Sequence, residues 1–122
     1  MLVILKQLTE ELYAECDLSW ERFSRFREEE YEPDFFTEVK PYADELQDKL
    51  VRWKQLSQEY IFKNRPKHIH MVQINNASDA FEQFVVQSFY IKTSKKRFFQ
   101  SIQSVKYTCE TFLRTLEAEP VD

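Results

Sequence analysis

The stretch "RFFQSIQSVKYTCETFLRTLE", Arg97 to Glu117, decides the fold because its apolar side chains recur at steps of three and four. Such steps follow the 3.6-residue turn of an α-helix, so one face of the segment is apolar and the other is polar. The apolar positions are Phe98, Ile102, Val105, Cys109, Phe112 and Leu116. A helix with such a face needs other helices to cover it.

Three upstream segments carry the same pattern and provide those partners. Four amphipathic helices joined by short connections pack most economically as an up-and-down antiparallel four-helix bundle. The sequence therefore predicts an all-α fold in which residues 1–122 form a single domain. The other expected core positions are Leu5, Leu8, Leu12, Cys16, Ser19, Phe23 and Phe26; Ala43, Leu46, Leu50, Trp53, Ser57 and Tyr60; and Ile74, Ala77, Phe81, Phe84, Ser88 and Ile91.

The connections carry the signals expected between such helices. Asp34 precedes a short helical lead-in, Phe35 to Val39, and Pro41 suits the first position of the second long helix. Asn64 is expected to end that helix in a left-handed conformation, and Pro66 prevents its continuation. His70 and Gln73 resemble half of a capping box before the third helix, and Thr93 or Ser94 caps the fourth.

The up-and-down topology also predicts which charged segments meet. It places "REEEYEPD", residues 27–34, beside "KTSKKR", residues 92–97, at one end of the bundle. It places Arg65 and Lys67 at the other end, beside an acidic tail. The tail residues are Glu117, Glu119 and Asp122. We expect opposite charges to be neutralised at both ends, with about 0 to 1 kcal/mol from each exposed pair.

The composition excludes several classes of protein. The chain has no glycine, which argues against tight hairpins and nucleotide-binding loops. No apolar run is long enough for a membrane span, and "MLVILKQ" at the start lacks the basic flank of a signal peptide. We therefore expect a cytoplasmic protein without a membrane partner. Cys16 and Cys109 are expected as thiols, close together if Cys16 lies level with about Thr108.

The sequence offers no catalytic, cofactor or metal motif, so we expect a protein that is not an enzyme. Di-iron bundles need inward Glu residues and two Glu-x-x-His pairs, but neither His68 nor His70 has Glu three positions earlier. The expected core positions carry no carboxylate. The two histidines also share no helical face and have no cysteine nearby, so no metal site is expected.

Two surfaces remain as candidate binding sites. Val86 and Tyr90, four residues apart, are expected to face away from the core stripe and to form a partner surface. The leading hypothesis is therefore a protein–protein interaction module with an unidentified protein partner or a homodimer. The alternative is a small-anion, metabolite or metal site in the basic corner between the second and third helices. That corner holds Arg65, Lys67, His68 and His70.

Nucleic-acid binding is not expected. The net charge is -4, and the two basic clusters are predicted at opposite ends of the bundle. No continuous positive surface results.

A set of short motifs runs through the chain after the first helix. The motifs are "DFF" at Asp34 to Phe36, "KP" at Lys40 and Pro41, "RW" at Arg52 and Trp53, "RPK" at Arg65 to Lys67 with His70, "QI" at Gln73 and Ile74, "QS" at Gln87 and Ser88, "KKRF" at Lys95 to Phe98, and "YT" at Tyr107 and Thr108. With these motifs, most of the chain after the first helix resembles the YppE-like family of uncharacterised small bacterial proteins. The resemblance implies a compact up-and-down helical bundle in the cytoplasm of Bacillus-type bacteria, with no established activity, cofactor or substrate. It transfers no catalytic residues.

Overall fold

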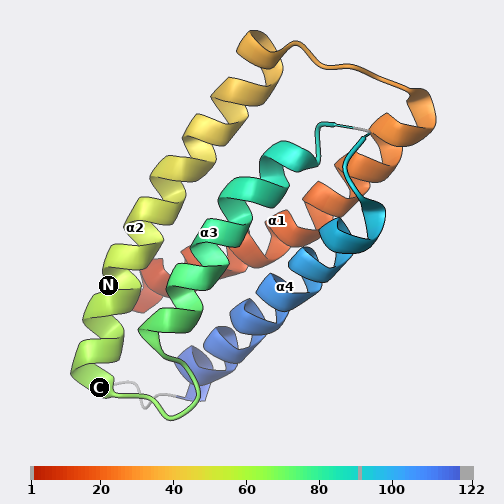
Figure 1. Ribbon diagram of the computed structural model, residues 1–122. Coiled ribbons are helices and arrows are strands. Elements are labelled where there is room, and N and C mark those ends of the chain that lie inside the picture. The colour runs from red at the N-terminus through yellow and green to blue at the C-terminus, as the bar shows by residue number, and fades with distance from the viewer. Residues whose placement is uncertain (1, 91, 119–122) are drawn as a thin grey trace.

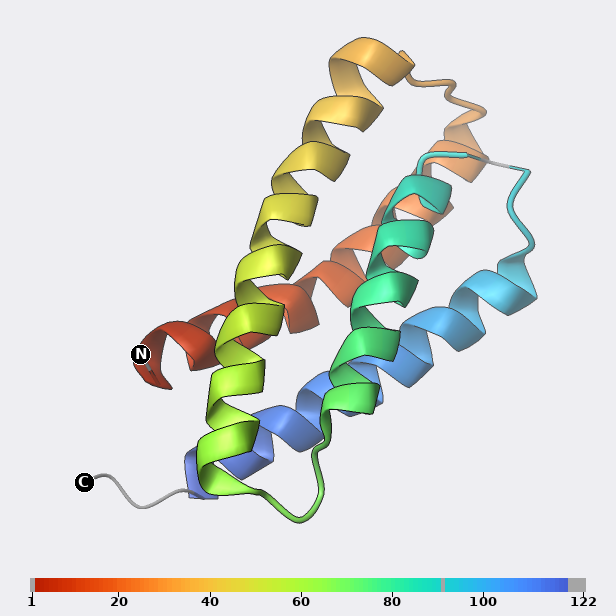
Figure 2. The same ribbon diagram turned by 60° about the vertical axis from the view of Figure 1, so that its left-hand side comes forward.

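Two layers of antiparallel helices form the molecule. The computed structural model describes residues 2–90 and 92–118, which contain no strand. Helices α1 and α4 run side by side in opposite directions, and α2 and α3 do the same across them (Figures 1 and 2). The predicted all-α, up-and-down four-helix bundle is confirmed. The elements are α1 (Leu2–Glu29), a short π-helix η1 (Phe35–Val39), α2 (Lys40–Asn64), α3 (Met71–Gln87) and α4 (Lys95–Ala118).

The predicted core stripe is buried along all four helices. Of the expected positions that the structure describes, only Ala43 is half-buried rather than buried, and Ile91 lies outside the described residues. Near the end of the bundle where α4 begins, the Phe98 ring is 0% exposed and its centroid lies 4.5 Å from that of Phe23 and 6.3 Å from that of Phe84. Phe98 therefore joins α4 to both α1 and α3. Ile69, in the connection before α3, is also fully buried and was not expected in the core.

Polar contacts between α1 and α4 fix their register. Lys6 lies 3.9 Å from Glu117, the Tyr13 hydroxyl donates to Glu110 over 2.8 Å, and Lys106 donates to Asp17 over 2.9 Å. Residue numbers rise along α1 as they fall along α4. This ladder therefore places Cys16 opposite Tyr107, one residue from the expected position.

The short lead-in before α2 is confirmed, and it takes the form of a π-helix. The Asp34 carboxylate accepts hydrogen bonds from the amides of Phe36 and Thr37, at 2.9 and 3.1 Å. In return, the Asp34 amide donates to the Glu38 carboxylate over 2.8 Å. These contacts satisfy amides that a helix start leaves without partners, so η1 is held firmly against the start of α2.

Two helix ends differ from the sequence prediction. The left-handed residue after α2 is Arg65, with φ 45°, rather than Asn64, whose side chain donates to the Tyr60 carbonyl. Arg65 precedes proline, which disfavours the α-helical conformation at that position. Helix α3 ends at Gln87 instead of continuing to residue 91, because the next residues make a tight turn with Phe89 packed inward.

The charged segments meet at one end as expected, but the expected ion pairs do not form among the described residues. Glu32 and Lys92 line one hollow, so the first and third connections do meet. Within residues 2–90 and 92–118, however, no ion pair joins those two connections. At the other end Glu117 pairs with Lys6, while Glu119 and Asp122 lie outside the described residues. Exposed loop charges gain too little in water to hold one geometry.

The complete burial of Phe98 makes a quantitative prediction. Phe98→Ala should lower the free energy of unfolding by about 3 to 5 kcal/mol, because it removes a fully buried ring and leaves a cavity. Phe62→Ala is the matched control, because Phe62 is 77% exposed. This substitution should lower the free energy of unfolding by less than about 1 kcal/mol. Urea unfolding measures both values. Equal losses in the two variants would contradict the central role of Phe98.

Candidate functional site

A buried carboxylate lies between α1, α2 and the turn after α3, where the sequence predicted none. Glu15 is only 7% exposed. One carboxylate oxygen accepts a hydrogen bond from the Tyr42 hydroxyl, and the other accepts one from Ser19 over 2.7 Å. The second oxygen also lies 3.5 Å from Nη1 of Arg22. Glu15 was not among the expected core positions, which carry no carboxylate. Its burial is possible because Tyr42 and Arg22 supply the partners that a buried charge requires.

The Arg22 guanidinium is enclosed as completely as the carboxylate. Its centre lies 4.3 Å from the centroid of the Tyr42 ring and 4.7 Å from that of Phe89, and Nη1 donates to the Ser88 hydroxyl over 2.8 Å. Planar stacking between aromatic rings suits guanidinium, which is weakly hydrated. Because these groups already bond to one another, we assign them a positioning role: they tie α1 to the start of α2 and to the end of α3.

The basic corner predicted as an anion site is exposed. Arg65, Lys67, His68 and His70 all face solvent. The Arg65 guanidinium lies 5.9 Å from the centroid of the Phe62 ring, and the His70 amide donates to the Gln73 side chain over 2.7 Å, as one half of a capping box. His68 lines a hollow against α4, but the other three residues do not line that hollow. The described part of the chain holds no group of three or more His, Cys, Asp or Glu side chains suited to a metal ion.

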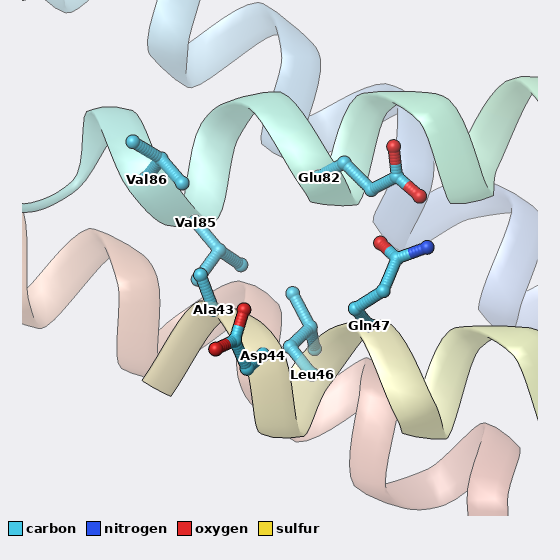
Figure 3. Close-up of a pocket in the computed structure, with 7 residues that line it drawn as sticks. All are labelled: Ala43, Asp44, Leu46, Gln47, Glu82, Val85 and Val86. Atoms are coloured by element: carbon cyan, nitrogen blue, oxygen red, sulfur yellow. The ribbon is translucent and has the colours of Figure 1, made fainter. Parts of the chain in front are cut away.

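The predicted partner residues, Val86 and Tyr90, do not share a helical face. Val86 is half-buried and packs on a small apolar cluster. It also lines a shallow hollow of about 170 Å³ between α2 and α3, where Gln47 and Glu82 approach each other from opposite sides (Figure 3). Tyr90 follows the end of α3 and is exposed at the end of the bundle. The four-residue spacing misplaced Tyr90 because the helix stops before it.

Exposed aromatic side chains gather at the end of the bundle where Tyr90 lies. We call this surface the aromatic end and define it by Tyr31, Phe35, Phe36 and Tyr90. The Tyr31 hydroxyl donates to Glu38 over 2.6 Å, which holds the residue against η1. The rings of Phe35 and Phe36 meet edge to face with centroids 5.2 Å apart, and Phe36 is 76% exposed. The two adjacent phenylalanines in a polar connection were the sequence signal for this surface.

A hollow of about 360 Å³ opens at the aromatic end. Its lining combines apolar rings with one acidic and one basic side chain. The lining residues are Tyr31, Glu32, Pro33, Phe89, Tyr90 and Lys92.

The two cysteines are free and buried. Burial raises the pKa of the Cys109 thiol to about 12 and raises the pKa of the Cys16 thiol further still. The neighbouring Cys109 adds to the increase at Cys16. At neutral pH both groups are therefore protonated thiols, the unreactive form of cysteine.

The buried pair predicts an asymmetric response to mutation. Arg22→Met should lower the free energy of unfolding by about 3 kcal/mol, because it leaves the Glu15 carboxylate buried without its cation. Combining it with Glu15→Leu should recover part of that loss. Arg25→Met, at an exposed position of the same helix, is the control. In urea unfolding at pH 7, a loss in Arg22→Met no larger than in Arg25→Met would contradict a buried pair.

The environment of Tyr42 predicts a stability change at high pH. Burial, and then the hydrogen bond to Glu15, raises the pKa of Tyr42 to about 12 from its ordinary value of 10.0. The folded protein thus retains a proton that the unfolded chain releases above pH 10, so this stabilisation is present below pH 10 and is lost as the pH approaches 12. At pH 9 the free energy of unfolding of the wild type should exceed that of Tyr42→Phe, and this excess should shrink as the pH rises to 12. A constant difference would count against this assignment.

Comparison with known proteins places the chain in a family. The profile of a bacterial domain of unknown function, DUF1798, matches residues 9–116. The uncharacterized protein YppE of Bacillus subtilis is 32% identical over 104 residues, which are 85% of each chain. The crystal structure of that YppE superposes with a TM-score of 0.91 at 28% identity, over 96% of this chain and 95% of its own. The crystal structure of a Listeria innocua protein of unknown function superposes with a TM-score of 0.87 at 28% identity, over 93% of this chain and 90% of its own. The chain therefore belongs to the bacterial DUF1798 family of unknown function.

Proposed function

We propose that the protein is a non-enzymatic, cytoplasmic protein–protein interaction module that contacts its partner through the aromatic end. The observation that carries this proposal is the Phe36 side chain, 76% exposed on a short helix whose first amides are capped by Asp34. Large aromatic side chains are enriched at the centres of protein interfaces, where they supply most of the binding energy. An exposed ring on a firm support is suited to that role.

Local hydrogen bonds prepare this surface for binding. Asp34 caps η1, Glu38 accepts from both the Asp34 amide and the Tyr31 hydroxyl, and η1 continues directly into α2. A surface held in this way loses little conformational entropy when a partner binds. The cost that an open, mobile loop would incur on association is thereby reduced.

The adjacent hollow supports the same proposal. Its volume of about 360 Å³ accommodates a large side chain from a partner, and the rings of Phe89 and Tyr90 contribute to its wall. Glu32 and Lys92 lie in its lining with opposite charges. An apolar centre with a polar, charged rim is the usual arrangement of a transient protein interface.

The chemistry of this end favours a protein partner over nucleic acid or a membrane. The acidic residues 28–30 lie at and just after the end of α1, and the basic residues 95–97 begin α4, so this end carries both signs of charge. In the described residues, no helix has the length and apolar character needed to cross a membrane. The partner is either a different protein or a second copy of this chain. Free, buried thiols suit the reducing cytoplasm.

The chain offers a matched pair of variants for the test. Phe36 and Phe62 are 76% and 77% exposed, at opposite ends of α2 and its lead-in, so Phe36→Ser and Phe62→Ser remove the same group from equally exposed positions. Phe36→Ser should abolish self-association in light scattering, or release the partner captured from native cytosol, with an unchanged thermal midpoint. Phe62→Ser should retain the complex.

Tyr90→Glu places a charge in the same surface and should weaken the complex as Phe36→Ser does. A strict monomer without a captured partner overturns the proposal. A complex that is indifferent to Phe36→Ser, or equally sensitive to Phe62→Ser, does so as well.

A further inference from the structure

The hollow that His68 lines is at the end of the molecule opposite the aromatic end. There the α2–α3 connection approaches the last turns of α4 (Figures 1 and 2). Its volume is about 440 Å³, within the range of sites for small molecules. Three separate parts of the chain supply its walls: the connection, the first turn of α3 and the second half of α4. The lining residues are His68, Gln73, Tyr107, Thr111, Arg114, Thr115 and Ala118.

Among the described residues, the lining is rich in hydrogen-bond donors and contains no carboxylate. Arg114 brings a permanent positive charge, and His68, Tyr107 and Thr111 bring groups that donate hydrogen bonds. The exposed Tyr107 ring adds a flat apolar surface. Such a set of side chains complements a negatively charged group attached to a flat or apolar body.

Arg114 is available for a ligand. Glu110 and Glu117 lie four residues before it and three after it on α4, the spacing at which helical ion pairs form. Each acid is engaged elsewhere, because Glu110 accepts from Tyr13 and Glu117 pairs with Lys6. Among the described residues, no carboxylate lies within ion-pair distance of Arg114.

Thr111 supplies an independent observation. It is 8% exposed, and its hydroxyl has no hydrogen-bond partner among the described residues. Its neighbours along α4 behave differently, because Thr108 and Thr115 each donate to the carbonyl four residues earlier, at 3.3 and 2.9 Å. A buried hydroxyl without a partner is destabilising because it has lost its hydrogen bonds to water. A wall of the hollow therefore contains a polar group whose bonding capacity is unused.

We propose that this hollow binds a small organic anion. Arg114 and His68 hold its carboxylate or phosphate group, the body of the ligand lies against the Tyr107 ring, and the Thr111 hydroxyl turns to bond to it. The site differs from the expected basic corner, since it shares only His68 with that set and takes its permanent charge from α4. It is also separate from the aromatic end, so either proposal can fail without the other.

Three probes distinguish the chemistry that the site recognises. Benzoate and phenyl phosphate present the two anionic groups on the same ring, and benzamide presents the ring without charge. Each is titrated into the full-length, isotope-labelled protein while backbone amide shifts are recorded by NMR. Saturable shifts at Gln73, Thr111 and Arg114 are expected with one or both anions, and benzamide should bind at least about tenfold more weakly, a difference of about 1.4 kcal/mol. The tighter anion identifies the recognised group.

Two variants and one control complete the test. Arg114→Gln should lower the affinity for the anion by about tenfold or more. Arg97 is an exposed arginine in the first turn of the same helix, and Arg97→Gln should leave the affinity unchanged. Thr111→Val should raise the midpoint of thermal unfolding, because it removes a buried hydroxyl that has no partner among the described residues. The same change should lower the affinity for the anion. Absence of saturation with both anions overturns the proposal. Equal binding of benzamide, or binding unaffected by Arg114→Gln, does the same.

Discussion

The burial of the Phe98 ring between α1 and α3 is the contact on which the rest of the structure depends. Its neighbours are rings from both layers of the bundle: Phe23 and Trp20 on α1 and Phe84 on α3. The contacts from Lys6–Glu117 to Asp17–Lys106 report the antiparallel register of α1 and α4. Phe98 extends that packing toward the aromatic end and joins it to α3. The hollow beside Arg114 lies at the opposite end of the same two layers.

The parts of the fold that could be predicted depend on periodicity within a single segment. The stripe from Leu5 to Phe26 and the stripe from Phe98 to Leu116 recur at helical steps, and all their members are buried as expected. The lead-in at residues 35–39 was predictable from a different local signal, because Asp34 before it and Pro41 after it are typical of helix starts. Local chemistry is readable from sequence because each residue's neighbours along the chain are known.

The candidate sites depend on contacts between distant segments, which a single sequence does not contain. Glu15 sits beside the stripe on α1 with Ser19 and Arg22 at helical spacing, and this polar run was the available signal for a buried pair. Its burial requires Tyr42 and the turn after α3 to close over it. Tyr90 was misplaced for a similar reason: Ser88 bonds to Arg22 and Phe89 turns inward, so tertiary contacts end a helix that the apolar pattern would extend.

The Phe89 ring contacts both the buried ion pair and the outer surface. One side covers the Arg22 guanidinium in the interior, and the ring also lines the hollow at the aromatic end. A molecule pressing into that hollow therefore touches the cover that keeps water away from the Glu15–Arg22 pair. The covering of the buried ion pair and the wall of the outer hollow therefore depend on the same aromatic side chain.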